Sequence, residues 1–547
     1  MVQVTPVSSQ KLLWGIGKFH SGMGLNVETP TGEELQSLML RLLKCKTSIE
    51  ADALLREIDV DAEMSFEDVD WQQLREQDSR GSLKFPYINW AERKLIFSGC
   101  DFGDGDITLA GVFKGPVNFD GAHFGQGDVS FVGSEFSFLR MRGVRFSGRG
   151  KVMFGASYFA EETVFQIEDL GQKLLWFTKT INPTRTGSYG CTFSGRKVLL
   201  AIIGSSGTEI NFSQARFDVQ SAILDFSGAT RLARVDFSET KWESHTVTLH
   251  GLQTRFDSGQ PGQSNRLLFN GASFEKVKML KFDDLGMKQG LMDFTFARFP
   301  TTGVFKVVFS DVGPGQINFH QAVFPGNVEF SQNDSARFFA ELSFFGTTFQ
   351  GALLFRGVKF GPVPDLRGTE FQKHLSLSEI EFGAHMSRKD KRNEIERASK
   401  LNRFKELAEA NRDHSFALDC HAEEMQHRRF QKPGWKAKAA DYLDMAYQVT
   451  SDYGRSIMLP VCWLSIVWSV FKLVYWYGFD SIESAGLFSA AWTFPFLPAS
   501  GALRLSNFAE VFAQGAPSLF ILMGLQGLLS IALFFLIGLG FRNRFRI

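Results

Sequence analysis

Residues 344–382 read FFGTTFQGALLFRGVKFGPVPDLRGTEFQKHLSLSEIEF, and this stretch sets the architecture of the chain. In it a large apolar residue stands five positions before a second large apolar residue, usually phenylalanine. Such a pair begins every eleven residues, at positions 344, 355, 366 and 377. Neither the period of an α-helix nor that of a β-strand produces a spacing of five. The stretch therefore predicts a repeated structural slot rather than a single helix or strand.

The same slot recurs from Phe97 to Phe382. A small or β-branched residue stands two positions before the second member of most pairs, as Ala122 does before Phe124, so the slot reads FxxAxF. We expect a solenoid that turns a corner every five residues, with the phenylalanine side chains pointing to the axis and two pairs in each coil. The expected core includes Phe119, Phe124, Phe131, Phe136, Phe344, Phe349, Phe355, Phe360, Phe371 and Phe382.

The composition agrees with a long repeat. Of 547 residues, 57 are Phe and only 8 are Tyr, a bias expected where one residue type fills the same slot many times. Fourteen pairs would make seven well-marked coils, and more if the degenerate stretches also coil. Residues 166–210 and 257–265, rich in Gly, Ser and Asn, are expected to leave the coil as loops.

Two segments, VNFDGAHFGQGDVSFVGSEF (117–136) and LLFRGVKFGPVPDLRGTEF (353–371), resemble the Phe-rich variant of the pentapeptide-repeat family. The resemblance covers about half of the chain and implies a mainly β fold, a right-handed quadrilateral β-helix. Some members of that family are acidic mimics of duplex DNA that bind type II topoisomerases. Residues 97–384, however, hold 28 Lys+Arg and 29 Asp+Glu, a net charge of 28 − 29 = −1, which is too balanced to imitate a polyphosphate. This balance disfavours a DNA-mimic regulator, which is a further alternative. The whole chain holds 59 Lys+Arg and 59 Asp+Glu, which does not support a basic nucleic-acid binder, so we expect no nucleic-acid partner.

Helical patterns flank the repeat on both sides. Residues 1–90 contain an amphipathic segment that opens with a capping box, Thr31 and Glu34, and we interpret them as a helical cap on the solenoid. A docking site for a partner is the alternative. After the repeat region 91–384, the charged pattern of residues 385–454 predicts an α-helical connector.

The end of the chain has the composition of a membrane protein. Residues 457–479 contain a single charge and residues 516–541 contain none, so each is long and apolar enough to span a bilayer. We expect a two-span membrane module over residues 455–547. Its expected interfacial anchors are Lys472, Trp476, Arg542 and Arg544.

The basic residues set the expected orientation. They gather before the first span and after the second, whereas Arg504 is the only basic residue of the connecting loop. By the positive-inside rule, both termini would lie in the cytoplasm. The first apolar stretch of the chain is too short and polar for a signal peptide. The expected location is the inner (cytoplasmic) membrane, with the solenoid in the cytosol.

The loop between the spans is itself apolar over residues 485–496, which is too short to span but suits an interfacial or re-entrant segment. Helix, re-entrant segment, helix is the topology of the simplest tetrameric cation channels, although the TVGYG filter is missing. Re-entry would imply a homo-oligomer that encloses a cavity. The pore candidates are Gln526, Ser530, Met523, Phe494, Pro495 and Pro498. An interhelical hydrogen bond is the alternative role of Gln526 and Ser530.

Two further segments, TSDYGRS (450–456) and GLGFRNRFRI (538–547), resemble a bacterial group in which Phe-rich pentapeptide repeats precede two membrane helices of channel-like topology. The leading hypothesis is an oligomeric membrane protein with a channel-like pore, gated or assembled through the cytosolic solenoid as a sensor or scaffold. A bacterial defence role is compatible by analogy. The alternative is a membrane-tethered, protein-binding scaffold without a pore.

An enzyme is the third and weakest hypothesis. The sequence shows no nucleophile with a base, no paired carboxylates, no metal cluster and no phosphate loop that stands out. We expect no catalytic residues and no cofactor. His421, Glu424 and His427 fall at i, i+3 and i+6 of an expected helix, but the HExxH motif is absent. We therefore expect structural or solvated roles for them and no metal. The remaining partners would be the membrane, further copies of the chain and a protein bound by the solenoid.

Overall fold

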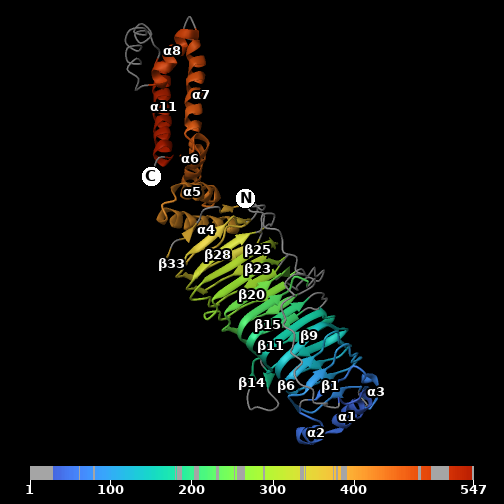
Figure 1. Cartoon of the computed structure of the whole chain (residues 1–547). Coiled ribbons are helices and arrows are strands. Elements are labelled where there is room, and N and C mark those ends of the chain that lie inside the picture. The colour runs from blue at the N-terminus through green and yellow to red at the C-terminus, as the bar shows by residue number, and fades with distance from the viewer. Residues whose placement is uncertain are drawn as a thin grey trace, which may run out of the picture.

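The chain forms a long rod with helices at both ends (Figure 1). The N-terminal helices lie at one end, the strands stack along the middle, and two long helices extend from the other end. The computed structural model describes residues 29–60, 62–77, 81–178, 180–181, 188–202, 209–228, 233–251, 253–254, 265–287, 290–313, 315–332, 338, 340–373, 375–376, 380–382, 391–477, 482–494 and 517–544.

The strands form a parallel solenoid of about ten turns. Each turn contributes a strand to an 11-stranded sheet in which sequence order and spatial order are the same. This order arises only when every strand stacks on the strand of the next turn. The sheet consists of β2 (Leu83–Lys84), β5 (Ile107–Thr108), β8 (Val129–Ser130), β10 (Arg149–Met153), β12 (Gln172–Trp176), β16 (Glu209–Asn211), β18 (Arg234–Asp236), β22 (Asn265–Leu268), β24 (Gly290–Asp293), β26 (Gly315–Asn318) and β29 (Glu341–Ser343).

A second, 17-stranded sheet wraps the other sides of the rod. It contains β1 (Glu63–Ser65), β3 (Ile88–Ala91), β4 (Lys94–Ile96), β6 (Gly111–Asn118), β7 (His123–Phe124), β9 (Glu135–Phe146), β11 (Tyr158–Asp169), β15 (Thr192–Ile202), β17 (Arg216–Asp225), β19 (Lys241–Trp242), β20 (Thr246–His250), β21 (Gln253–Thr254), β23 (Met279–Met287), β25 (Val304–Val312), β28 (Asn327–Gln332), β31 (Leu353–Arg356) and β34 (Leu375–Ser376). Short ladders complete the corners: β27 (Val323–Phe324) with β30 (Thr348–Phe349) and β33 (Glu370–Phe371), and β32 (Lys359–Phe360) with β35 (Glu381–Phe382).

Stacked aromatic rings fill the axis of the rod. In one ladder successive ring centroids lie 4.6–5.1 Å apart, and in a second they lie 3.9–6.0 Å apart. Since parallel strand layers are themselves about 4.8 Å apart, each ring rests on its equivalent in the next turn. The first ladder is Phe131, Phe154, Phe177, Phe212, Phe237, Phe269, Phe294, Phe319 and Phe344. The second is Phe113, Phe136, Phe159, Phe193, Phe217, Trp242, Phe274, Phe299, Phe324, Phe349 and Phe371.

The predicted core phenylalanines lie where the repeat places them. Eight of the ten are buried, whereas Phe371 and Phe382 are half-buried because they belong to the last turn. No further turn stacks on that end in the part of the chain that the structure describes. Helix α4 (Lys391–Ala410) covers it instead, with the ring of Phe404 5.1 Å from that of Phe382.

The first turns begin earlier than the expected boundary at residue 91. Strand β1 pairs in parallel with β4, and β3 pairs in parallel with β6, so solenoid strands start at Glu63. Met64, Leu83 and Ile88 fill the inward positions of these turns and are buried. The FxxAxF spacing cannot reveal turns whose slots hold other apolar residues.

The expectation that residues 166–210 leave the coil is wrong for most of their length. Strands β11, β12 and β15 lie in the two large sheets, and Phe177 and Phe193 belong to the two ring ladders. Among the described residues of this segment, a short antiparallel hairpin, β13 (Thr180–Ile181) and β14 (Ser188–Tyr189), departs from parallel stacking. Residues 257–264 lie outside the described residues, and β22 begins at Asn265.

Three helices cover the first turns: α1 (Gly32–Lys44), α2 (Ser48–Leu55) and α3 (Trp71–Glu76). The predicted capping box is present, because Glu34 N–H donates to the Thr31 hydroxyl and Thr31 N–H donates to the Glu34 carboxylate. The apolar faces of these helices join the core of the solenoid, and the ring of Trp71 lies 4.5 Å from that of Phe102.

Replacing a ladder ring should unfold the rod at lower denaturant. Phe319→Ala removes a ring that is 1% exposed and stacks on Phe294 and Phe344, so we expect a loss of about 3–5 kcal/mol in unfolding free energy. Phe296→Ala is the matched control: its ring is 60% exposed, and we expect a change below about 0.5 kcal/mol. Urea unfolding of the full chain in detergent, followed by circular dichroism, measures both. Equal effects would contradict the axial stacking.

Candidate functional site at the membrane end of the chain

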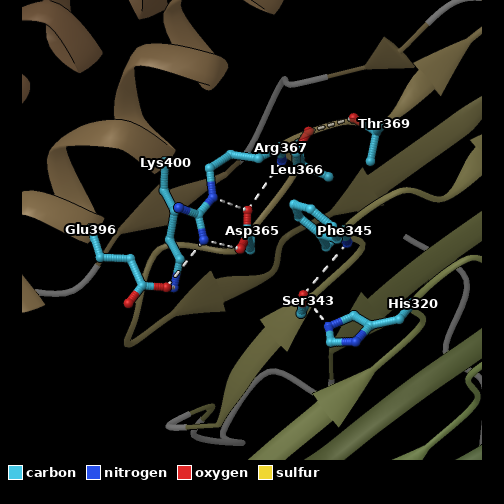
Figure 2. Close-up of polar contacts among 9 residues, drawn as sticks. All are labelled: His320, Ser343, Phe345, Asp365, Leu366, Arg367, Thr369, Glu396 and Lys400. Atoms are coloured by element: carbon cyan, nitrogen blue, oxygen red, sulfur yellow. Dashed lines mark hydrogen bonds and ion pairs between the residues drawn. The ribbon is translucent and has the colours of Figure 1, made fainter.

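A polar network joins the last solenoid turn to helix α4 (Figure 2). The guanidinium of Arg367 donates two hydrogen bonds to the carboxylate of Asp365, at 2.8 and 2.6 Å, and Arg367 N–H donates a third at 3.0 Å. The same guanidinium donates to Glu396 of α4 at 3.2 Å, and Lys400 lies 3.2 Å from Glu396. The bidentate Arg367 therefore joins the strand corner at Asp365 to helix α4.

The corner one turn earlier, at Ser343, makes its hydrogen bonds to other residues of the solenoid. Ser343 stands in register with Asp365, accepts a hydrogen bond from Phe345 N–H at 3.4 Å and lies 2.8 Å from a ring nitrogen of His320 (Figure 2). At the final turn the corner residue Asp365 instead shares its arginine with helix α4. At the opposite end of the rod, Arg93 similarly joins the Trp90 carbonyl to the Leu55 carbonyl of α2.

The charges at the junction hold Asp365 ionised. Burial would raise the pKa of this carboxyl, which is 6% exposed. Hydrogen bonds from the Arg367 side chain and backbone N–H, together with the positive charges of Arg367 and Lys400, outweigh burial and lower the pKa. The ion pair is therefore complete at neutral pH.

Helices α4 and α5 (His414–Arg428) form a pair that continues the chain toward the two candidate membrane-spanning helices. Asp413 caps α5 by accepting from Phe416 N–H at 3.1 Å. On α5, Glu424 is 2% exposed and lies 2.6 Å from Arg428. His421 is 3.7 Å from Glu424, whereas His427 faces Glu423 at 3.8 Å. The three metal candidates therefore do not converge, and no other group of metal-ligating side chains does so among the described residues.

Further contacts join α5 to the solenoid end of the two candidate membrane-spanning helices. Arg455 donates to Asp419 of α5 at 2.9 Å, and Asn543, near the end of the chain, donates to the carbonyl of Gly454 at 3.3 Å. Gly454 ends a left-handed turn with Asp452 and Tyr453, and a Cβ on it would meet the Asn543 amide at 2.9 Å. The TSDYGRS segment is thus a sharp, tightly packed corner.

Helices α7 (Met458–Trp476) and α11 (Pro517–Arg544) are long and apolar enough to cross a membrane. They run side by side away from the solenoid (Figure 1). Helix α8 (Ile482–Thr493), from the loop between them, packs against both. The indole N–H of Trp468 donates to the Gly486 carbonyl at 3.1 Å, which places α8 beside the middle of α7.

Gln526 of α11 is the polar centre of these three helices. It is fully buried and accepts a hydrogen bond from the hydroxyl of Tyr475 at 2.9 Å. Its amide nitrogen lies 2.9 Å from the carbonyl and hydroxyl oxygens of Ser489 and 2.8 Å from the hydroxyl of Thr493. All these partners belong to one chain. The sequence prediction missed Ser489 and Thr493, although two hydroxyls four residues apart in an apolar segment are a usable signal.

The other pore candidates also lie within the helix unit. Met523 is 3% exposed and Ser530 is fully buried, and the Ser530 hydroxyl has no hydrogen-bond partner among the described residues. The ring of Phe494 lies 6.1 Å from that of Phe534 on α11. Pro495 and Pro498 lie outside the described residues. For Gln526 the geometry favours the interhelical hydrogen bond, the alternative to a pore-lining role.

The predicted anchors occupy the two ends of the helix pair. Lys472 packs over the ring of Trp468, 5.3 Å from its centroid, and against Gly486, where a Cβ would meet the lysine Cε at 3.4 Å. Its stem thus lies between α7 and α8. Trp476 is 49% exposed at the far end, and Arg542 and Arg544 are exposed at the solenoid end.

Comparison of the chain with protein-family models, with curated proteins and with solved structures finds no match. The observed parallel solenoid agrees with the fold implied by the resemblance to pentapeptide repeats. What the structure establishes is a mainly β solenoid with a helical C-terminal part and two candidate membrane-spanning helices.

Gln526→Leu should destabilise the helix unit, because the hydroxyls of Tyr475, Ser489 and Thr493 would lose their shared buried partner. We expect a loss of about 1–3 kcal/mol in unfolding free energy. Ser530→Ala, one turn along α11, is the control and should be nearly neutral, because its hydroxyl has no described partner to lose. Thermal unfolding in detergent compares them. Equal stability of the two variants would argue against the hydrogen-bonded centre.

The junction predicts a defined pH dependence. The pKa of Asp365 is lower in the folded than in the unfolded chain, where it is about 3.9. Its stabilisation is therefore present above about pH 4 and is lost as pH falls through the lowered pKa. Asp365→Asn should reduce stability at pH 7 by about 1–3 kcal/mol and weaken the dependence of stability on acid pH. Asp218→Asn, at a half-exposed carboxylate, should leave both almost unchanged. Denaturant midpoints at pH 7 and pH 3 measure the difference.

Proposed function

We propose that this protein is a membrane-tethered scaffold whose solenoid binds a protein partner. The observation that carries the proposal is the continuous set of contacts from the last solenoid turn to the base of α7 and α11. Arg367 binds α4 to the solenoid, α4 packs on α5, and Arg455 binds the membrane corner to α5. A solenoid held in this way would keep a fixed orientation to the bilayer.

The surface chemistry of the solenoid supports a protein partner rather than a nucleic acid. Acidic and basic side chains pair across neighbouring turns, as in Glu243 with Arg216 and Lys276, 2.5 and 2.8 Å away. Glu329 similarly lies 3.3 Å from Lys306 and 3.8 Å from Arg356. Such pairing leaves no single-sign stripe along these turns that would follow a polyanion. A non-enzymatic binding role fits this mixed polar surface.

The proposed location is the inner membrane of a bacterium, with the solenoid and both termini in the cytoplasm. The exposed Arg542 and Arg544 lie at the solenoid end of the helix pair, on the same side as Arg455. The positive-inside rule supports the cytoplasmic side for this end.

A channel-like pore is the second candidate, and one observation favours it. Helix α8 lies alongside α7 and ends at Thr493, which contacts Gln526 well inside the apolar helix pair. A short helix that enters the membrane region and ends there is what a re-entrant segment requires. A pore would still need several copies of the chain around a shared axis. A defence role through such a pore rests on the sequence resemblance alone.

One reconstitution experiment separates the two candidates. The purified chain should remain in liposome pellets after alkaline carbonate, and a variant truncated after Tyr453 should not, because it lacks α7 and α11. For a scaffold we expect no ion flux above that of empty liposomes and protease access to residues 484–515 from the far side. Ion flux above that of empty liposomes, retained by Ser530→Ala, would establish the channel instead. Release of the intact chain by carbonate would overturn both candidates.

A further inference from the structure

Helix α6 (Trp435–Ser451), which precedes the first candidate span, carries an apolar face that the described residues leave largely uncovered. Trp435, Tyr442, Leu443 and Val449 are 76%, 63%, 73% and 53% exposed. Together with Ala439 and Ala446 they recur every three or four residues, so they form one stripe along the helix. A stripe of this size on a water-exposed helix is unusual unless something apolar covers it.

The opposite face of α6 is fixed against the protein, which determines the direction of the stripe. Asp444 forms an ion pair with Arg429 and accepts a hydrogen bond from the Tyr453 hydroxyl at 2.9 Å. Asp441 accepts from Phe430 N–H at 3.0 Å, and Ser451 is fully buried. Both acidic side chains of α6 are therefore bound internally, and the helix cannot turn its apolar face inward without breaking these bonds.

Exposed lysines border the apolar stripe. Lys436 and Lys438 lie on its two flanks, as the helical period of 3.6 residues requires, and Lys432 precedes the helix. No acidic residue forms an ion pair with any of the three in the described part of the chain. Lysines on the edges of an apolar face, with acids confined to the protein side, are typical of helices that lie at the surface of an anionic bilayer.

We propose that the outer face of α6 lies in the interfacial region of an anionic lipid bilayer. The stripe would contact acyl chains, while Lys432, Lys436 and Lys438 reach lipid phosphates. This inference rests on the proposed function, because α7 must span the same bilayer. The contact between α6 and α7 supports it: the indole N–H of Trp463 donates to the Val449 carbonyl at 2.9 Å, so the end of the stripe adjoins the membrane helix.

A second copy of the chain would fit the apolar stripe of α6 less well than an anionic bilayer does. In a parallel symmetric pair, the flanking Lys436 and Lys438 of one copy would approach the same lysines of the other, and in an antiparallel pair they would lie opposite the C-terminal half of α6. The acids that could neutralise them, Asp441 and Asp444, point toward their own chain. Like charges beside an apolar seam oppose association, whereas anionic lipid provides the complementary charge.

Spin labels on the full chain in nanodiscs test the inference. In a background with Cys45→Ser and Cys462→Ser, single cysteines replace Leu443 on the stripe, Gln448 on the opposite face, or Leu528 on α11. In phosphatidylcholine with 30% phosphatidylglycerol, we expect the ratio of oxygen to Ni-EDDA accessibility to be several-fold higher at positions 443 and 528 than at 448. The triple change of Lys432, Lys436 and Lys438 to Gln should lower the ratio at 443 several-fold and leave that at 528 unchanged.

The outcomes separate this inference from the proposed function. A lipid-exposed label at 528 with a water-exposed label at 443 would overturn the interfacial helix and leave the membrane anchor standing. A water-exposed label at 528 would overturn the anchor itself. Strong dipolar broadening between labels at 443 on two copies would show that a second chain covers the stripe, and this too would overturn the lipid assignment.

Discussion

The rest of this molecule depends on the parallel stacking of its backbone turns. Hydrogen bonds from each turn to the next hold this stack in register. Phe294 N–H donates to Asn318 O, and Phe319 N–H donates to Ser343 O, each at 2.7–2.8 Å, so one turn fixes the position of its successor. In-register stacking places identical slots above one another. A ring in that slot then meets another ring, and the aromatic ladders follow from the backbone rather than the reverse.

A stack of this kind must end somewhere, and helices close both of its ends through apolar and polar contacts. At the first turns, helices α1 to α3 add apolar side chains such as Trp71 to the aromatic core. Arg75 of α3 donates to the Phe102 carbonyl, and Arg93 donates to the Leu55 carbonyl of α2, both at 2.6 Å. At the last turn the closure is both apolar, through Phe404, and ionic, through the pair of Asp365 and Arg367 with Glu396. The ion pairs at this end restrict the orientation of α4 relative to the solenoid, because a bidentate guanidinium tolerates little rotation of the helix.

Most of the fold could be predicted from the sequence, because the FxxAxF slot is a local pattern with one geometric meaning. The prediction failed where other residues fill the slot. Met64 and Ile88 fill inward positions of the first turns, so the FxxAxF pattern does not mark those turns. Phe177 and Phe193 lie in a turn whose length obscures the five-residue spacing. The polar contacts could not be predicted from the sequence, for a different reason. Asp365 and Glu396, or Gln526 and Ser489, are far apart in sequence, and no local signal pairs them. The two apolar helices were predictable from composition alone.

The hydrogen bond from Asn543 to Gly454 connects the end of the second membrane helix with the corner before the first. Because Arg455 of that corner also holds α5, a pull on the solenoid does not act on α7 alone. In the proposed membrane-tethered scaffold, the force would be shared by two helices in the bilayer. A partner that tugs on the rod would therefore tilt the helix pair as one body before it could extract either helix.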